Sequence, residues 1–188
     1  MPAPTVILRL LKGDAQEMAE LQHVLEAVPT YAERIRGAPP GSADAQSIYS
    51  VLPPDKGYED KFVLGVYLED VMIGCVDLIR GYPDGHTAHL GLLLLAESYQ
   101  RRGIGQAAYL AVEDYVRRWG PVWTRVRIGV VRTNEDVLSF WTKLGFAPTG
   151  EVKPYRYANV TSETLVLCKS LHATSSPSSR HPSRHPSH

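Results

Sequence analysis

A glycine-containing turn between an apolar run and a long amphipathic segment holds the residues with the clearest chemical potential. The apolar run Leu90–Leu95 is followed, after a short polar crossing, by Gln100-Arg101-Arg102-Gly103-Ile104-Gly105. Apolar residues then recur at helical spacing as far as Trp119, where Gly120-Pro121 ends the pattern. A strand that enters a helix through such a turn leaves backbone N–H groups unpaired at the helix N-terminus, where the helix dipole adds positive potential. The stretch therefore predicts an anion site, most simply for phosphate.

Two motifs in this part of the chain resemble those of the GNAT family of N-acetyltransferases. Gln100–Gly105 resembles the Q/R-x-x-G-x-G/A signature, whose loop holds the pyrophosphate of acetyl-coenzyme A (acetyl-CoA) in that family. Asn134–Phe146 is similar to the N-x-x-A-x-x-F-Y-x-K-x-G-F segment that follows it. Two motifs at the family's separation are more specific than either alone, and the order of elements supports the resemblance from about Thr5 to Leu171.

The resemblance implies an acetyl-CoA site made largely of backbone groups. The amides of the glycine turn would bind the pyrophosphate, because glycine allows close approach. The side chains of Arg101 and Arg102 would either add positive charge to this site or be exposed to solvent without contacting the coenzyme. The preceding strand bulges and splays from its neighbour in the family, so its backbone would pair with the pantetheine arm and the thioester. The expected coenzyme-binding residues are Leu93, Leu94, Leu95, Gln100, Arg101, Arg102, Gly103, Ile104, Gly105, Gln106, Asn134 and Trp141.

His89 is the candidate general base. It lies eleven residues before Gln100, where some histone-acetylating members of the family place a glutamate. A neutral imidazole can accept the amine's proton directly or through a water, although a lone histidine on a strand is more often structural. His86 is a weaker candidate because it is nearer a turn. Glu69 and Asp77 are carboxylates on neighbouring strands, and a turn or a solvated face suits both.

Trp141 stands where many family members have a tyrosine thought to protonate the departing thiolate. An indole N–H cannot act as a general acid at biological pH, so Trp141 is expected to pack in the core or against the coenzyme. Water or one of three tyrosines would then supply the proton: Tyr99, Tyr155 and Tyr157. Asn134 matches the family's coenzyme-contacting asparagine and can also be the N-cap of the following helix.

The whole pattern predicts an α/β (α+β) protein with the GNAT fold. This fold is a central mixed, mostly antiparallel twisted sheet of about seven strands, flanked by about four helices. The expected strands are residues 5–11, 62–68, 71–79, 86–95, 126–130, 146–152 and 164–169. Helices are expected after Asp14, which with Glu17 forms a capping-box pattern, at 31–36, after Gly105 and after Asn134. Residues 38–61 are too rich in Pro, Gly, Ser and Asp for an assignment.

The composition of the chain limits its domain organisation, its partners and its location. The 188 residues suit one domain, residues 1–171, and the Ser/Pro/His/Arg segment 172–188 is expected to be disordered. Twenty basic residues balance twenty acidic ones, so no nucleic-acid partner is indicated. Two distant cysteines without zinc spacing indicate reduced core residues and no metal. No signal peptide or membrane span is evident, and a cytoplasmic protein is expected.

The resemblance implies an N-acetyltransferase that moves the acetyl group of acetyl-CoA to a primary amine in a ternary complex. The acceptor would lie near residues 29–61, which offer Tyr31, Asp44, Tyr49, Tyr58, Glu59 and Asp60. A small-molecule amine, an aminoglycoside, a peptide N-terminus and a lysine all remain open, as does a homodimer. One alternative is a non-catalytic acyl-CoA sensor. A more remote one is a Rossmann oxidoreductase, because residues 103–108 also satisfy G-x-G-x-x-A.

Overall fold

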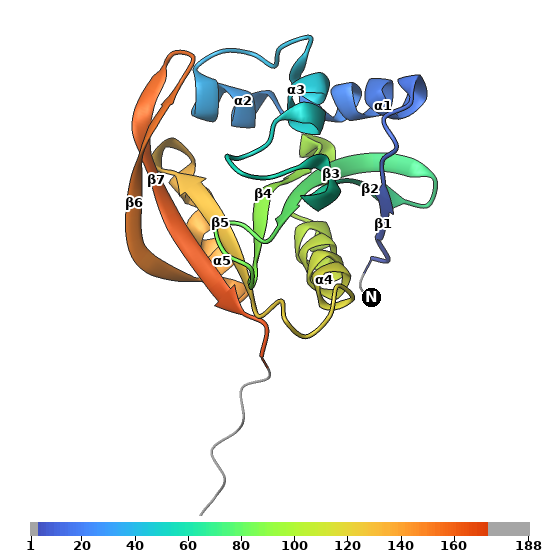
Figure 1. Ribbon diagram of the computed structural model, residues 1–188. Helices are drawn as coiled ribbons and strands as arrows, with labels where there is room; N and C mark the ends of the chain where they lie inside the picture. Colours follow the sequence, from blue (N-terminus) through green and yellow to red (C-terminus); the bar gives the residue numbers. More distant parts are fainter. Residues whose placement is uncertain (1–3, 173–188) are drawn as a thin grey trace, which may run out of the picture.

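A seven-stranded sheet crosses the centre of the computed structural model, which describes residues 4–172 (Figure 1). The strand order is β1-β2-β3-β4-β5-β7-β6, and every neighbouring pair is antiparallel except β4 and β5. The strands are β1 (Ile7–Leu10), β2 (Lys61–Leu68), β3 (Val71–Arg80), β4 (Thr87–Leu95), β5 (Arg125–Val131), β6 (Ala147–Tyr157) and β7 (Val160–Ser170). This is the predicted GNAT-type sheet. It is not the parallel sheet that a Rossmann enzyme requires.

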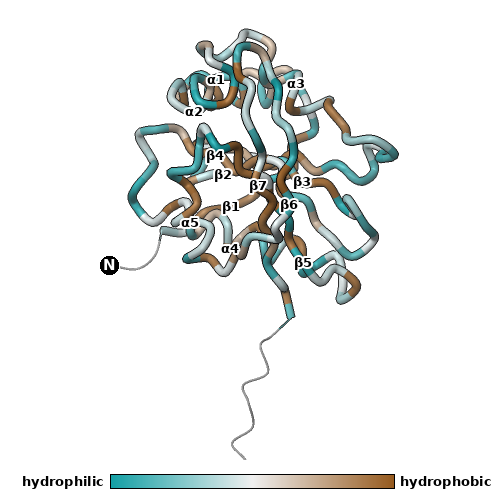
Figure 2. The backbone as a smooth tube through the Cα atoms, turned by 90° about the vertical axis from the view of Figure 1, so that its left-hand side faces the viewer, coloured by the Kyte–Doolittle hydropathy of each residue, from teal (hydrophilic) through white to brown (hydrophobic). Residues whose placement is uncertain are grey.

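Helices cover both faces of the sheet (Figures 1 and 2). They are α1 (Ala15–Glu26), α2 (Pro29–Arg36), α3 (Asp44–Ser50), α4 (Ile104–Arg117) and α5 (Leu138–Lys143). The first three lie on one face and the last two on the other. Each face has its own apolar core. The larger one centres on α4, whose residues at successive turns (Ile104, Ala108, Val112 and Val116) are all buried. None of the helices between residues 4 and 172 has the length and apolar content needed to cross a membrane.

The predicted helix starts and ends on the α1–α2 side are confirmed in detail. The Asp14 carboxylate accepts a hydrogen bond from the Glu17 amide at 2.9 Å and so caps α1. The Glu17 carboxylate reaches back to the amides of Lys12 and Gly13 at 2.6 and 2.8 Å. Gly37 ends α2 in the left-handed conformation with φ 66°. These local contacts fix the start of α1 and the end of α2.

Helix α3 is the element that the sequence pattern does not predict. It has no side-chain cap, and tertiary contacts hold it in place. Its residue Ala45 is buried, and the Ala45 amide donates to the Gln22 side chain of α1 at 3.0 Å. A 3₁₀ turn at Tyr58–Asp60 follows in the same unassigned segment. The expected disordered segment, residues 172–188, lies outside the described residues apart from His172.

Candidate active site

The central feature of the site is a break in the sheet between the parallel strands β4 and β5. These strands pair only through Thr87–Leu90 and Arg125–Ile128. Gly91 follows at once and is the extra residue of a bulge, because Leu90 pairs with Leu78 whereas Leu92 pairs with Asp77. Beyond this point no ladder joins the two strands within the described structure. The chain therefore has the bulge and the splay that the resemblance implies, in the strand that leads to the glycine motif.

The glycine motif forms an open cluster of backbone amides at the N-terminus of α4. Gly103 adopts φ 75° and begins the helix. The first amide with an intrahelical acceptor is that of Ala107, which donates to the Gly103 carbonyl at 3.2 Å. Among the described residues, the three preceding amides, from Ile104 to Gln106, have no acceptor. No heavy atom lies within 4 Å of where a Cβ on Gly103 would stand. These free donors form the anion site that the motif predicts.

The side chains beside the amide cluster have two kinds of environment: Gln100 holds the loop in place, and the two arginines are exposed. The Gln100 amide donates to the Leu95 carbonyl at 2.8 Å, which ties the loop to the end of β4 and occupies that carbonyl. Arg101 and Arg102 are exposed, and the Arg102 guanidinium lies 5.9 Å from the Tyr99 ring centroid. The arginines are therefore free to add charge beside the amide cluster.

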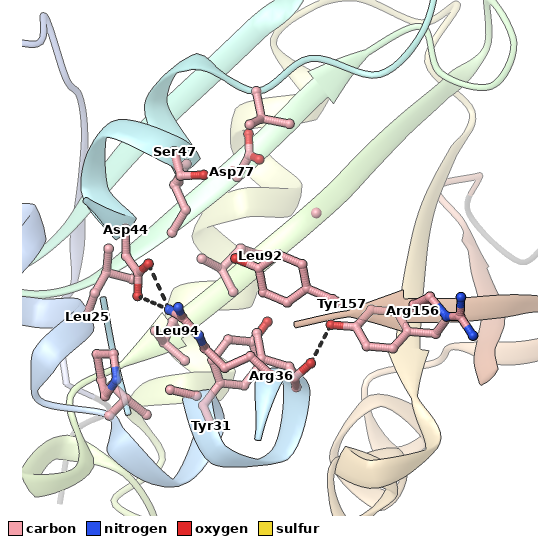
Figure 3. Close-up of a pocket in the computed structure, with 18 residues that line it drawn as sticks. Leu25, Tyr31, Arg36, Asp44, Ser47, Asp77, Leu92, Leu94, Arg156 and Tyr157 are labelled. Atoms are coloured by element: carbon pink, nitrogen blue, oxygen red, sulfur yellow. Dashed lines mark hydrogen bonds and ion pairs between the residues drawn. The ribbon is translucent and has the colours of Figure 1, made fainter. Parts of the chain in front are cut away.

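Two cavities lie on the opposite side of the splay, on the face that α2 covers. They have volumes of about 450 and 360 Å³ and share the walls formed by Tyr31, Ile35, Gly91 and Tyr155. The first, between α2, α3 and β4, is mostly apolar (Figure 3). Its charged groups include Arg36 and Asp44, which pair with each other at 3.0 Å. The second runs between β4 and β5 and contains His89, Arg127 and Lys153. Both volumes lie in the usual range for small-molecule sites.

His89 lies in the second cavity, beside the bulge. Its Nδ1 is 3.5 Å from Nη1 of Arg127, and its ring meets the Tyr82 ring edge-on at 5.5 Å. Burial, followed by the positive charges of Arg127 and Lys153, lowers the pKa of His89 to about 4. The imidazole is therefore neutral near pH 7, as an acceptor must be. By contrast, His86 is exposed in the turn before β4 and contacts the Val122 carbonyl at 3.1 Å.

Asp77 corrects the expectation of a solvated carboxylate. Its side chain is only 20% exposed and pairs with Nζ of Lys61 at 2.9 Å, and that lysine is 3% exposed. Burial raises the pKa of Asp77, and the Lys61 charge partly offsets the rise. The lysine contacts Oδ1, whereas Oδ2 lies 3.4 Å from where a Cβ on Gly91 would stand. One carboxylate oxygen is thus directed at the bulge. Glu69, by contrast, is exposed in the β2–β3 turn with φ 53°, as expected.

Trp141 packs in the core, which is one of the two places expected for it. It is 8% exposed, and its ring makes edge-on contacts with the rings of Tyr109, Phe140 and Phe146 at 5.8, 5.0 and 5.2 Å. The ring nearest the glycine motif is that of Phe140, which lies 3.4 Å from where a Cβ on Gly105 would stand. The tyrosine position of the family is therefore a packing position in this chain.

Asn134 does not cap α5, and that expectation is wrong. It lies in a 3₁₀ segment, Arg132–Val137, and has φ −118° and ψ 25°, while the residue that precedes α5 is Val137. The Asn134 side-chain oxygen instead accepts from Nη1 of Arg34 at 3.1 Å. Arg34 also pairs with Asp136 at 2.9 Å. Asn134 therefore helps to bind α2 to the segment before α5, a long-range contact that no local pattern contains.

Tyrosine hydroxyls surround the junction of the two cavities. Tyr155 donates to the Ile35 carbonyl at 2.7 Å. The hydroxyl of Tyr31 has no hydrogen-bond partner among the described residues, and burial strongly raises the pKa of Tyr31. Tyr157 lines the first cavity, whereas Tyr99 lies outside both. Tyr31 is one of the residues expected on the acceptor surface, and its side chain lines both cavities.

The expected acceptor surface is only partly realised. Of its six polar residues, Tyr31 and Asp44 line the first cavity. Asp60 and Tyr58 are used in the fold. Asp60 pairs with Lys56 at 2.7 Å and with Arg80 at 3.1 Å. The Tyr58 hydroxyl donates to the Ser50 carbonyl at 3.0 Å.

Comparison with known proteins agrees with this geometry. Residues 29–146 match the model of the acetyltransferase (GNAT) family. An acetyltransferase from Thermus thermophilus is 22% identical, with a TM-score of 0.67 over 90% of this chain and 99% of that one. A GNAT family acetyltransferase from Elizabethkingia anophelis, solved with acetyl-CoA bound, is 14% identical, with a TM-score of 0.60 over 88% and 98%. The PaiA N-acetyltransferase from Thermoplasma acidophilum, in complex with coenzyme A, is 19% identical, with a TM-score of 0.60 over 88% and 99%. No curated protein sequence matches. At these identities the structural likeness shows a shared fold.

Proposed function

Because the chain belongs to the acetyltransferase (GNAT) family, we propose that it transfers an acetyl group from acetyl-CoA to a primary amine by direct attack within a ternary complex. The observation that carries the proposal is the break between β4 and β5. It joins the free amides of the α4 N-terminus, on one face of the sheet, to a cavity with a neutral histidine on the other. A thioester and an amine that approach from the two faces would meet at the break.

The acetyl-CoA site would follow the backbone from β4 into α4. The amides from Ile104 to Gln106 would bind the pyrophosphate, with Arg101 and Arg102 adding charge. The splayed backbone from Leu93 to Leu95 would pair with the pantetheine arm, except for the Leu95 carbonyl, which Gln100 occupies. An amide donor directed at the thioester oxygen would stabilise the oxyanion, an effect on the order of 100-fold in rate or more. Gln100 would position the loop through its hydrogen bond to Leu95.

The side chains around the junction would handle the protons. The nitrogen lone pair of the acceptor attacks the thioester carbonyl carbon, so that a C–N bond forms and the C–S bond breaks. His89 accepts the proton that the nitrogen loses, directly or through a water. The Tyr31 hydroxyl, on a side chain that lines both cavities, donates a proton to the departing thiolate, and exchange with solvent then restores Tyr31 and His89. The products are the N-acetylated amine and free coenzyme A.

The first test is calorimetric titration with acetyl-CoA, with NADPH as the negative control, followed by a thiol-release assay over a panel of primary amines. We expect binding of acetyl-CoA alone and thiol release with at least one class of amine. Binding without turnover on every amine would instead favour the non-catalytic acyl-CoA sensor. Failure to bind acetyl-CoA in a folded protein would overturn the proposal as a whole.

A further inference from the structure

Arg127 is a buried cation without a close partner among the described residues. Its side chain is 8% exposed and lines the second cavity. Its two polar side-chain contacts are long: 3.4 Å to the Glu151 carboxylate and 3.5 Å to Nδ1 of His89. Charge-assisted hydrogen bonds are normally about 2.7–2.9 Å, and a buried charge without good partners is unfavourable. Lys153 lines the same cavity and pairs with the other oxygen of Glu151 at 3.2 Å, so two cations share one half-exposed carboxylate. An anion placed there would satisfy the guanidinium with a two-pronged contact that a carboxylate fits.

Asp77 offers the opposite charge at the other side of the bulge. Its Oδ1 is occupied by Lys61, but its Oδ2 is next to Gly91 and faces the first cavity. An ammonium group at the bulge would find a hydrogen-bond acceptor in Oδ2. The rest of the first cavity is mostly apolar and includes the rings of Tyr31, Tyr155 and Tyr157.

The two charged groups lie on either side of β4, near its bulge. His89 pairs in register with Arg127 on β5, and Gly91, two residues farther along β4, is shared by the walls of both cavities. Asp77 lines the first cavity and Arg127 the second. A ligand that carries its ammonium and its carboxylate on the same carbon is a compact way to reach both groups from the shared wall. The third substituent of that carbon would then point into the apolar cavity.

Resting on the proposed acetyl transfer, we propose that the acceptor is a free α-amino acid with a large apolar or aromatic side chain. Arg127 and Lys153 bind its carboxylate, Asp77 binds its amino group at the Gly91 bulge, and the first cavity holds its side chain. The cations of the second cavity oppose a polycation such as an aminoglycoside. A peptide N-terminus or a lysine in a protein has no carboxylate beside the reacting amine. The ammonium first gives one proton to solvent, and the neutral amino nitrogen then takes the acetyl group as described above and leaves as the N-acetyl amino acid.

The decisive comparison uses the unaltered protein and four probes that share one ring. L-phenylalanine carries all three recognised groups, phenylethylamine and phenylalanine amide lack the carboxylate, and 3-phenylpropionate lacks the amine. We expect thiol release to be fastest with L-phenylalanine, with kcat/KM at least about 10-fold higher than for the amide or the amine, as loss of a hydrogen bond to a charged group predicts. Equal or faster turnover of phenylethylamine would overturn the amino-acid proposal and leave acetyl transfer standing.

Calorimetry in the presence of coenzyme A separates recognition from catalysis. L-phenylalanine should bind, and phenylethylamine should bind at least about 10-fold more weakly. Binding of L-phenylalanine without any turnover would count against acetyl transfer while supporting the anion site. No binding of either compound, together with turnover of an unrelated amine, would reject the amino-acid proposal alone.

Substitutions in β5 test whether Arg127 binds the carboxylate of the amino acid. Arg127→Gln should raise KM for L-phenylalanine by about 10- to 100-fold and leave KM for acetyl-CoA unchanged. Arg127→Lys keeps the charge and should recover part of the loss. The matched control is Arg125→Gln, two residues earlier on the same strand, where the side chain is 47% exposed and lies 3.5 Å from Asp84. An Arg127→Gln protein that melts like the control but keeps its KM would refute the assignment. If Arg127→Gln does not fold, Arg127→Lys and the four-probe comparison decide the question.

Discussion

At the scale of single residues, the environment of His89 determines the pH range in which a base can act. Burial and the nearby Arg127 and Lys153 lower its pKa from 6.5 to about 4. A general base must be deprotonated, so in a kcat/KM profile expressed for the neutral amine the acid limb should fall near pH 4 and not near 6.5. His89→Ala should lower kcat/KM by about 10²- to 10⁴-fold and remove that limb. An unchanged rate with an unchanged pH profile would show that another group, or none, accepts the proton.

Tyr31 is the residue whose assigned role is easiest to separate from binding. Its hydroxyl has no partner among the described residues, so Tyr31→Phe removes only the proton that it could donate. We expect kcat to fall by about 10- to 100-fold, at the low end of the range for general acid–base catalysis, with the acetyl-CoA Kd unchanged. Tyr49→Phe is the control, because the Tyr49 hydroxyl lies 3.5 Å from the Leu11 carbonyl and lines neither cavity. A similar kcat in both variants would exclude Tyr31 as the donor.

At the scale of elements, the left-handed start of α4 is the feature on which acetyl-CoA binding should depend. Gly103 has φ 75° with nothing within 4 Å of a would-be Cβ. A bulky residue there would strain the backbone by about 1–2 kcal/mol and turn or cover the free amides. Gly103→Val should therefore weaken acetyl-CoA binding at least about 10-fold in calorimetry. The control is Gly120→Val beyond the other end of the helix, which also has a positive φ, 114°, and open space around it. Normal affinity in a folded Gly103→Val protein would contradict the loop assignment.

The elements that the sequence predicts well are those whose signals are local. Alternation, helical spacing and the capping residues Asp14 and Gly37 are enough to predict the sheet and the helices α1, α2 and α4. Local sequence patterns do not predict helix α3, because α3 depends on a contact with α1 between two residues that are 23 positions apart in the chain. The N-cap expectation for Asn134 is wrong for the same reason, because its partner Arg34 is 100 residues away.

The sequence predicts only the parts of the site that are made of backbone groups and of the glycine motif. The glycine turn and the bulge are local, and a family resemblance locates both. The cavities are not local, because α2, β3, β4, β5 and the β6–β7 hairpin all contribute walls. Asp77 was expected to be solvated because alternation alone cannot show that Lys61 and a helix cover that face. Arg127 carried no signal at all, since a buried arginine on a strand looks like any other charged residue in the sequence.

At the scale of the whole molecule, substitutions of Trp141 test whether this residue contributes to stability or to catalysis. It joins α5 to the main core through the rings of Tyr109 and Phe146. Trp141→Ala should lower the free energy of unfolding by about 3–5 kcal/mol in urea titrations. Trp141→Tyr restores the residue common in the family. Because this position is buried in the core, the new tyrosine hydroxyl should not reach the junction of the two cavities, and kcat should not rise. An increase in kcat on that substitution would mean that the position reaches the reacting atoms.

The break between β4 and β5 also has a consequence for the kinetics of the whole protein. Helix α4 lies on the face of the sheet opposite α2 (Figure 1), and residues of α2 line both cavities, so the two substrates would have separate routes to the same point. Neither one blocks the route of the other, and neither product must leave first. We therefore expect random addition. Initial-velocity lines should intersect, as in any mechanism with a ternary complex, and product inhibition tests the order. Free coenzyme A should compete only with acetyl-CoA, and the acetylated product should compete only with its parent amine.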